Sequence, residues 1–158
     1  MQLTRPLLII DLESTGVDPM QDRIVQLGVS VLHPDGTVNP RGWQRLINPT
    51  IPIPAAATAV HHITDEMVRG KPKVAEIIPS LLKFIGKDII IGHGIALDLA
   101  FIATAAKRHQ IPCTLLSHPT IDTLRMARLY GESPVNSLAM LRHHFNIPDE
   151  GAHRAMNA

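Results

Sequence analysis

Near its start the chain reads Leu7-Leu8-Ile9-Ile10-Asp11-Leu12-Glu13. The four apolar residues form a continuous run, which predicts a strand buried on both faces. Residues i and i+2 of a strand lie on the same face about 7 Å apart, so Asp11 and Glu13 leave one side together. Two such carboxylates repel unless one takes up a proton or a cation lies between them, and their hard oxygen atoms suit Mg²⁺ or Mn²⁺. The alternative is a strand that ends in solvated charge.

The segments that follow this strand predict a mixed α/β sheet. Alternation of apolar and polar residues over 25–31 predicts a half-buried second strand, and turn residues at 33–36 lead to an irregular edge strand near 37–47. Short strands are expected at 88–91 and 120–121, and helices at 74–85, 95–109, 122–129 and 137–145. The order predicts a five-stranded α/β fold, in which a three-strand antiparallel meander is joined by parallel strands and flanked by helices.

Composition narrows the class of protein. A chain of 158 residues with 45% apolar and 18% charged residues fits one globular domain, 1–158, and excludes a disordered chain. Its single cysteine, Cys113, excludes an internal disulfide and favours a reducing, cytoplasmic setting. The net charge of +1 gives no general attraction for nucleic acid, so a polyanion site must be local or metal-mediated. The apolar segment 89–106 contains Asp98 and two glycines, so we expect no membrane span.

A third carboxylate, Asp98, stands in a segment almost free of charge. Burial of a carboxylate is costly unless it finds a partner. The strand before it points its carboxyl end toward the edge where ligands gather in open α/β sheets, which favours a functional role. The alternative is a first-turn carboxylate that complements the helix dipole.

The histidines alone indicate a catalytic or metal site less strongly than the carboxylates do. His153 lies beyond a loop with Pro148 and Gly151, in a chain with nine histidines, so by itself it indicates little. The adjacent pairs at 61–62 and 143–144 have no cysteine or carboxylate partner at the spacing of zinc ligands, so no zinc site is predicted.

Taken together and in order, six segments resemble the motifs of one family. They are DLESTGVDP at 11–19, DRIVQLG at 22–28, AVHHITDE at 59–66, IGHGIALD at 91–98, DTL at 122–124 and GAHRA at 151–155. The chain resembles the DEDDh 3′→5′ exonucleases, the group that contains the proofreading subunit of bacterial replicative polymerase. It departs from their pattern at His62, where glycine is usual, and at Gly94, where asparagine is common.

The resemblance implies an RNase H-like fold and a two-metal phosphodiesterase. Asp11, Glu13 and Asp98 would hold two ions, Mg²⁺ or Mn²⁺, which stabilise the attacking and leaving oxygens of an in-line displacement. His153 would act as general base on the attacking water, since a neutral imidazole accepts a proton near pH 7. Four further residues would border the pocket for the terminal nucleotide: Ser14, Thr15, Gly16 and His61.

One position departs from the family in a way that bears on activity. The fourth metal carboxylate of the family lies five residues after the histidine, and that position is Ala158 here. Asn157 does not replace it, because a helical neighbour points about 100° away. The family's final helix is also missing from the sequence, which leaves a trimmed chain, a fragment and an aspartate-to-alanine inactivation as open explanations. We expect the chain as written to bind metal poorly and to cleave slowly or not at all.

The sequence therefore supports one leading hypothesis and two alternatives. The leading one is a metal-dependent exonuclease that releases nucleoside monophosphates from the 3′ ends of single-stranded DNA. The alternatives are a catalytically silent module that binds nucleic acid or docks on a polymerase, and an exoribonuclease that trims RNA. The expected partners are a DNA or RNA 3′ end and a DNA polymerase or a fused domain.

Overall fold

The predicted sheet is present in the computed structural model, which describes residues 3–131 and 133–148, apart from the side chains of residues 40 and 41. Within these residues, five strands form one sheet in the order β3-β2-β1-β4-β5. The strands are β1 (Leu7–Ser14), β2 (Ile24–Leu32), β3 (Val38–Leu46), β4 (Ile89–Gly92) and β5 (Thr120–Asp122). The first three form an antiparallel meander, while β4 runs parallel to β1 and β5 parallel to β4. The predicted fold class is confirmed.

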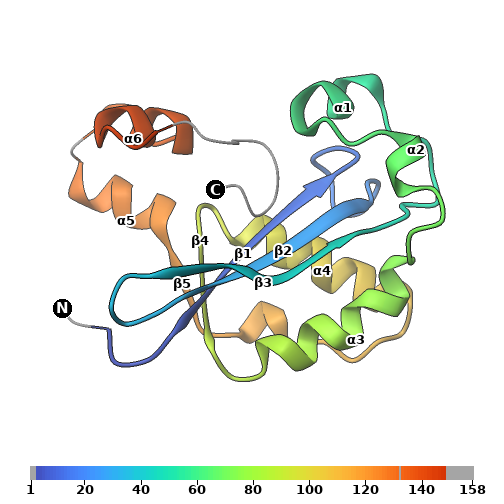
Figure 1. Ribbon diagram of the computed structural model, residues 1–158, viewed down its shortest axis with the longest axis horizontal. Coiled ribbons are helices and arrows are strands. Elements are labelled where there is room, and N and C mark those ends of the chain that lie inside the picture. The colour runs from blue at the N-terminus through green and yellow to red at the C-terminus, as the bar shows by residue number, and fades with distance from the viewer. Residues whose placement is uncertain (1–2, 132, 149–158) are drawn as a thin grey trace.

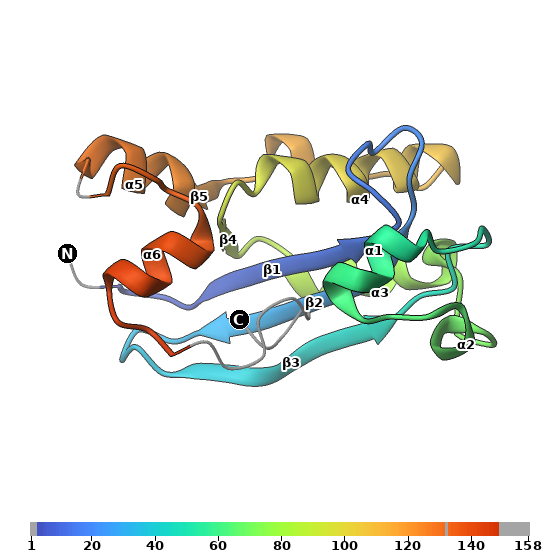
Figure 2. The same ribbon diagram turned by 90° about the horizontal axis from the view of Figure 1, so that it is seen from above.

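Helices surround this sheet (Figure 1). They are α1 (Ala55–His61), α2 (Asp65–Val68), α3 (Val74–Ile85), α4 (Ala96–Arg108), α5 (Thr123–Tyr130) and α6 (Leu138–His144), with a 3₁₀ turn at Leu115–Ser117. In Figure 1, α1 and α2 lie near the end of β1, whereas α5 and α6 lie at the other side of the molecule. The view from above shows α4 running alongside β1, with β3 at the far edge (Figure 2).

The main core lies between the sheet and the pair α3 and α4. From α3 it contains Ile77, Ile78, Leu81 and Ile85, and from α4 Leu99, Phe101, Ile102, Ala105 and Ala106. Full burial of one such large aliphatic side chain stabilises the fold by roughly 1.5–3 kcal/mol. A smaller cluster joins Val25 of β2 to the α1–α2 region through Ile53, Ile63 and Val68. β1 and α4 both contribute to the main core, which holds the two elements together.

Strand β2 is buried on both faces, so the prediction of a half-buried strand was wrong. Its polar residues Gln26 and Ser30 are only 7% and 6% exposed. β2 lies between β1 and β3 in the sheet. Alternation of apolar residues tells which face is apolar, but it does not tell whether the rest of the chain covers the other face.

Strand β3 lies at the edge of the sheet, as predicted. A Cβ atom at Gly42 would lie 2.2 Å from the carbonyl oxygen of Val29, and the register shifts between Val29 and Val31. Glycine therefore allows the close approach of β3 to β2. No helix in the described part of the chain is long and apolar enough to cross a membrane, and segment 89–106 is divided between β4 and α4.

Candidate active site

Strand β1 carries two carboxylates toward its carboxyl end. Asp11 pairs with Gly28 of β2, and Glu13 pairs with Gln26. Both carboxylate side chains are half-buried, and their spacing along the strand directs them to one face. A register shift follows directly after Glu13, so the regular strand ends at these carboxylates.

The third carboxylate reaches the same region from the next strand. β4 runs parallel to β1 and ends at Gly92. The turn that follows has Gly94 at φ 70°, and the Gly94 N–H donates to Asp122 Oδ1 over 2.9 Å. Helix α4 starts directly after this turn and carries Asp98 in its first turn.

The three carboxylates share one electrostatic environment. Burial, followed by the charges of Asp11 and Asp98, raises the pKa of Glu13 to about 7. Burial and the charge of Asp11 raise the pKa of Asp98 to about 7. Burial also raises the pKa of Asp11, and hydrogen bonding from the backbone of Leu12 opposes the rise at both Asp11 and Asp98. Asp11, Glu13 and Asp98 thus lie close enough for their charges to interact.

The donor set fits a hard divalent cation, although the side chains do not form a closed cage. Among the described residues, no three Asp, Glu, His or Cys side chains converge as a metal-binding group. Neighbouring carboxylates repel unless one takes up a proton or a cation lies between them. Burial raises the pKa of all three groups, and neighbouring negative charge adds to the rise at Glu13 and Asp98, so a bound cation would favour their ionised forms. Carboxylate oxygens are the ligands that Mg²⁺ and Mn²⁺ prefer.

A rigid turn follows Glu13 and contains three of the predicted substrate-binding residues. Ser14 Oγ donates to the Gly16 carbonyl. Thr15 is 3% exposed, and its backbone N–H donates to the Arg23 carbonyl over 2.9 Å. A Cβ atom at Gly16 would lie 2.3 Å from Asp22 Oδ2, so a side chain there would displace the Asp22 carboxylate. The turn is held by internal bonds, and contact with substrate stays a prediction for all three residues.

Asp22 organises this turn, a role that the sequence analysis missed. Its Oδ1 accepts from Thr15 Oγ1 over 3.0 Å, and its Oδ2 accepts from the Asp18 N–H over 2.9 Å. The Arg23 N–H in turn donates to Thr15 Oγ1. In the sequence, only the presence of Asp22 near Gly16 points to such a bond. It does not show which groups the carboxylate contacts.

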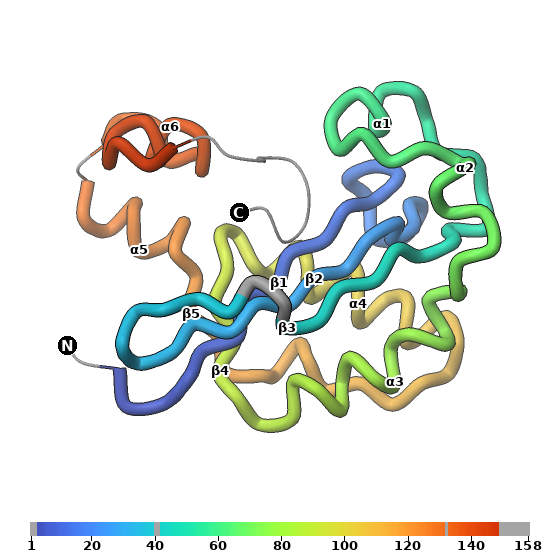
Figure 3. The backbone as a smooth tube through the Cα atoms, in the orientation of Figure 1, coloured from blue at the N-terminus to red at the C-terminus, as the bar shows by residue number. Residues whose placement is uncertain are grey.

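His61 supports the turn from α1, which lies beside it in Figure 3. The ring is 2% exposed, and its Nδ1 accepts from the Ile63 N–H over 3.0 Å. Nε2 therefore carries the proton and donates to the Ser14 carbonyl over 3.2 Å. Burial lowers the pKa of His61, which favours the neutral ring that the bond to Ile63 requires. The structure places His61 beneath the turn, and its contact with substrate stays a prediction.

Two of the predicted positions cannot be placed. The proposed general base His153 and the position of the fourth carboxylate, Ala158, both lie outside the described residues. The roles assigned to them stay predictions.

The comparisons with known proteins define the family. The sequence profile of the exonuclease family matches residues 8–157. The chain belongs to the exonuclease family. This match confirms the resemblance seen in the sequence, and it covers the carboxylates of β1 and α4 within the exonuclease domain.

Two relatives of this exonuclease domain are DNA polymerase III proteins. It is 34% identical over 149 residues to the PolC-type DNA polymerase III of Latilactobacillus sakei subsp. sakei, which covers 94% of this chain and 10% of that protein. It is 28% identical over 150 residues to the DNA polymerase III subunit epsilon of Aquifex aeolicus, covering 94% of this chain and 72% of the relative. The exonuclease chain thus spans about a tenth of the PolC-type relative.

Solved structures of exonucleases share the fold. E. coli exonuclease I in complex with a dT13 oligonucleotide superposes with a TM-score of 0.82 at 20% identity, covering 98% of this chain and 38% of that one. Exonuclease X in complex with 5′ overhanging duplex DNA superposes with a TM-score of 0.70 at 27% identity, covering 96% of this chain and 82% of that one. These likenesses confirm the RNase H-like fold.

Proposed function

We propose that this exonuclease domain releases nucleoside monophosphates from the 3′ ends of single-stranded DNA by metal-dependent hydrolysis. The observation that supports the proposal is the grouping of Asp11, Glu13 and Asp98, from a strand and a helix, where burial and then neighbouring carboxylate charge raise the pKa values of Glu13 and Asp98 to about 7. DNA is favoured over RNA because the relatives are DNA polymerase III proteins and the structural neighbours are bound to DNA. A cytoplasmic setting, expected from the single Cys113, belongs to this proposal.

Each residue of the site has a role in this proposal. Asp11, Glu13 and Asp98 would hold Mg²⁺ or Mn²⁺. When bound, these ions would supply Lewis-acid stabilisation of the attacking and leaving oxygens. His153, by its position in the family motif, would accept the proton of the attacking water. The turn at 14–16, fixed by Asp22 and His61, would hold the terminal nucleotide.

The residue at position 158 affects the expected rate of metal-dependent cleavage. In the proposed site an alanine supplies no ligand oxygen, so the chain as written would hold the ions weakly. Ala158→Asp is therefore expected to raise metal-dependent cleavage by about tenfold or more, which corresponds to about 1.4 kcal/mol of added stabilisation. A polymerase that carries or binds this domain is the proposed partner, in line with the PolC-type and epsilon relatives.

The test is cleavage of 5′-labelled single-stranded DNA with Mn²⁺, Mg²⁺ or EDTA. We expect a ladder that shortens from the 3′ end, faster with Ala158→Asp and absent with Asp98→Asn. Asp35→Asn, at an exposed turn, is the matched control and should cleave normally. A retarded but intact DNA band with Ala158→Asp would favour the silent binding module instead. Preferential shortening of a matched RNA would favour the exoribonuclease.

A further inference from the structure

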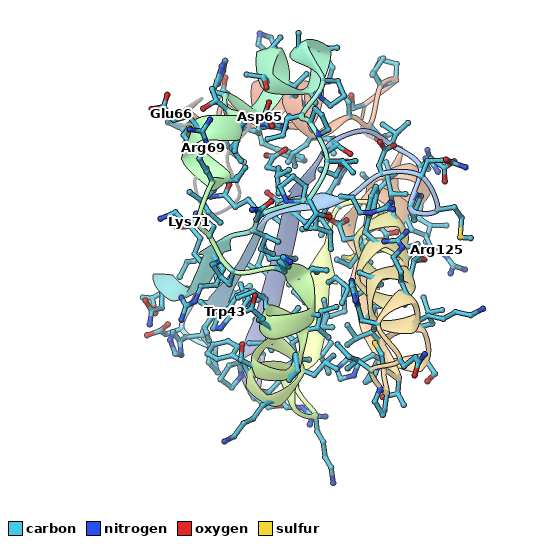
Figure 4. The ribbon with its side chains drawn as sticks, turned by 90° about the vertical axis from the view of Figure 1, so that its right-hand side faces the viewer. Trp43, Asp65, Glu66, Arg69, Lys71 and Arg125 are labelled. Atoms are coloured by element: carbon cyan, nitrogen blue, oxygen red, sulfur yellow. The ribbon has the colours of Figure 1, made fainter. Side chains whose placement is uncertain are left out.

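A pocket is lined in part by Asp22 and Arg23, from the segment between β1 and β2. It has a volume of about 160 Å³ and lies between the start of β2, the start of α3 and the end of α4. Asp11, Glu13 and Asp98 are not among its lining residues. Figure 4 looks on to this side of the molecule and shows α3 and α4 side by side, with Arg69 and Lys71 on the segment that leads into α3.

The charged groups that line this pocket are mainly basic. Arg23, Lys73 and Arg108 line it, together with a single carboxylate, Asp22. Both oxygens of Asp22 already accept hydrogen bonds, one from Thr15 and one from the Asp18 backbone. Three cations therefore line the pocket with one carboxylate, and the net charge of its lining is positive.

The two arginines of the pocket donate to backbone carbonyls. Arg23 Nη1 donates to the backbone carbonyls of residues 21 and 22, and Arg108 Nη2 donates to those of residues 19 and 20. In the described part of the chain, Arg23, Lys73 and Arg108 have no carboxylate within ion-pair distance. Burial, and then the charge of Arg23, lower the pKa of Arg108. The basic groups of the pocket thus outnumber its one carboxylate, Asp22.

We propose that this pocket binds a phosphate group, held by Arg23, Lys73 and Arg108. A guanidinium presents a planar fork of N–H donors that matches two phosphate oxygens, and hydrogen bonds between charged groups are about twice as strong as neutral ones. A liquid water occupies about 30 Å³, so a pocket of about 160 Å³ accommodates a phosphate with a few waters.

Two helix ends adjoin the pocket, and their effects oppose each other. The start of α3 at Val74 lines it, and its positive dipole end favours an anion. The end of α4 carries the opposite partial charge near Arg108, but its last carbonyls already accept from backbone N–H groups at 109–111. The three side-chain cations therefore determine the sign of the electrostatic potential in the pocket.

The pocket is joined to the candidate active site through Asp22 and Arg23, which both line it and both hydrogen-bond Thr15. The Arg23 backbone makes two hydrogen bonds with Thr15, which lies in the turn after Glu13. A phosphate on Arg23 and Arg108 would stiffen the loop between them. It could come from a nucleic-acid strand that continues past the site or from a free phosphate compound, and both sources share the chemistry proposed here.

Calorimetric titration of inorganic phosphate into the 158-residue chain tests the site. The titration is run with EDTA at constant ionic strength, so that it does not depend on metal binding or cleavage. We expect saturable binding that is weakened about tenfold or more by K73Q/R108Q, because charge-assisted hydrogen bonds are lost. K83Q/K87Q makes the same charge change at exposed positions outside the pocket and should bind normally. K73Q alone, at an exposed side chain, gives a second reading if the double variant is unstable.

A second arm separates the two sources. Binding of a labelled oligo(dT) is followed by fluorescence anisotropy over a salt series. If a strand supplies the phosphate, K73Q/R108Q weakens DNA binding. It also reduces the slope of log K against log[salt] by the amount expected for the loss of about one to two phosphate contacts. If a free phosphate compound is the ligand, DNA binding stays unchanged while phosphate binding falls. No phosphate binding to the unmodified chain, or equal binding to K73Q/R108Q, overturns the proposal whatever the exonuclease assay shows.

Discussion

Glu13 and Asp98 are held where ionisation is unfavourable, since burial and neighbouring carboxylates raise both pKa values to about 7. In the unfolded chain, such groups ionise near pH 4. The folded state therefore binds their protons more tightly than the unfolded state. Their contribution to stability is complete below about pH 4 and is lost as the pH rises from there through about 7. Without a cation, these groups make the fold less stable at pH 8 than at pH 5.

Replacing Glu13 by glutamine should remove part of this pH dependence. We compare the free energy of unfolding of Glu13→Gln with that of the unmodified chain. On going from pH 5 to pH 8, this difference should shift in favour of the variant by on the order of 1–2 kcal/mol, after allowance for screening by water. Urea unfolding with EDTA at the two pH values measures the difference. Glu66→Gln, at an exposed site, is the control and should follow the unmodified chain. Parallel stability curves for Glu13→Gln and the unmodified chain would contradict the assigned environment.

The Asp22 carboxylate is the second side chain on which the site depends. Asp22→Ala removes both acceptors that hold Thr15 Oγ1 and the Asp18 N–H. We expect a loss of about 1–3 kcal/mol and faster hydrogen exchange at the Asp18 amide. Asp35→Ala also removes hydrogen bonds, but at an exposed turn with Thr37, so it should cost less and leave Asp18 unchanged. Unaltered exchange at Asp18 in Asp22→Ala would show that other contacts hold the loop.

At the scale of elements, Asp122 connects two parts of the site. It is the N-cap of α5, where its Oδ1 accepts from the Leu124 N–H over 2.9 Å. The same oxygen accepts from Gly94 in the turn before α4. Burial opposes the ionisation of Asp122, but hydrogen bonds from these backbone groups outweigh it and lower the pKa. One carboxylate thus fixes both α5 and the turn that positions Asp98.

Loss of this double contact should affect both stability and activity. Asp122→Ala is expected to cost about 1–2 kcal/mol, the range for a helix cap, and to slow cleavage because the start of α4 loosens. Ser137→Ala is the matched control, since Ser137 caps α6 through a longer bond of 3.4 Å to Met140 and holds no part of the carboxylate site. Urea unfolding and the nuclease assay, with Ala158→Asp as the common background, measure both effects. If the two variants lose cleavage equally, the contact of Asp122 with the turn before α4 has no particular effect on activity.

The elements themselves could be predicted because their signals are local. Helix α3 begins at Val74 and ends at Ile85 as the apolar spacing indicated, and Asp122 caps α5 as predicted. Bonds between distant segments carry no such signal. The contact of His61 with Ser14 spans 47 positions, and periodicity does not reveal that a histidine is buried beneath a turn. The covered second face of β2 escaped prediction for the same reason.

For the whole molecule, a divalent cation should act as a cross-link between β1 and α4. A ligand that binds only the folded state stabilises it by RT ln(1 + [L]/Kd), and each kcal/mol raises the midpoint of a domain this size by roughly 2–4 °C. Millimolar Mn²⁺ should therefore raise the thermal midpoint of the unmodified chain modestly and that of Ala158→Asp further. The increase should be larger at pH 8 than at pH 5, because protons compete for Glu13 and Asp98. Asp98→Asn should abolish it. If Mn²⁺ raises the thermal midpoint of Asp98→Asn as much as that of the unmodified chain, the ion binds elsewhere. These carboxylates would then not be the metal ligands of the proposed reaction.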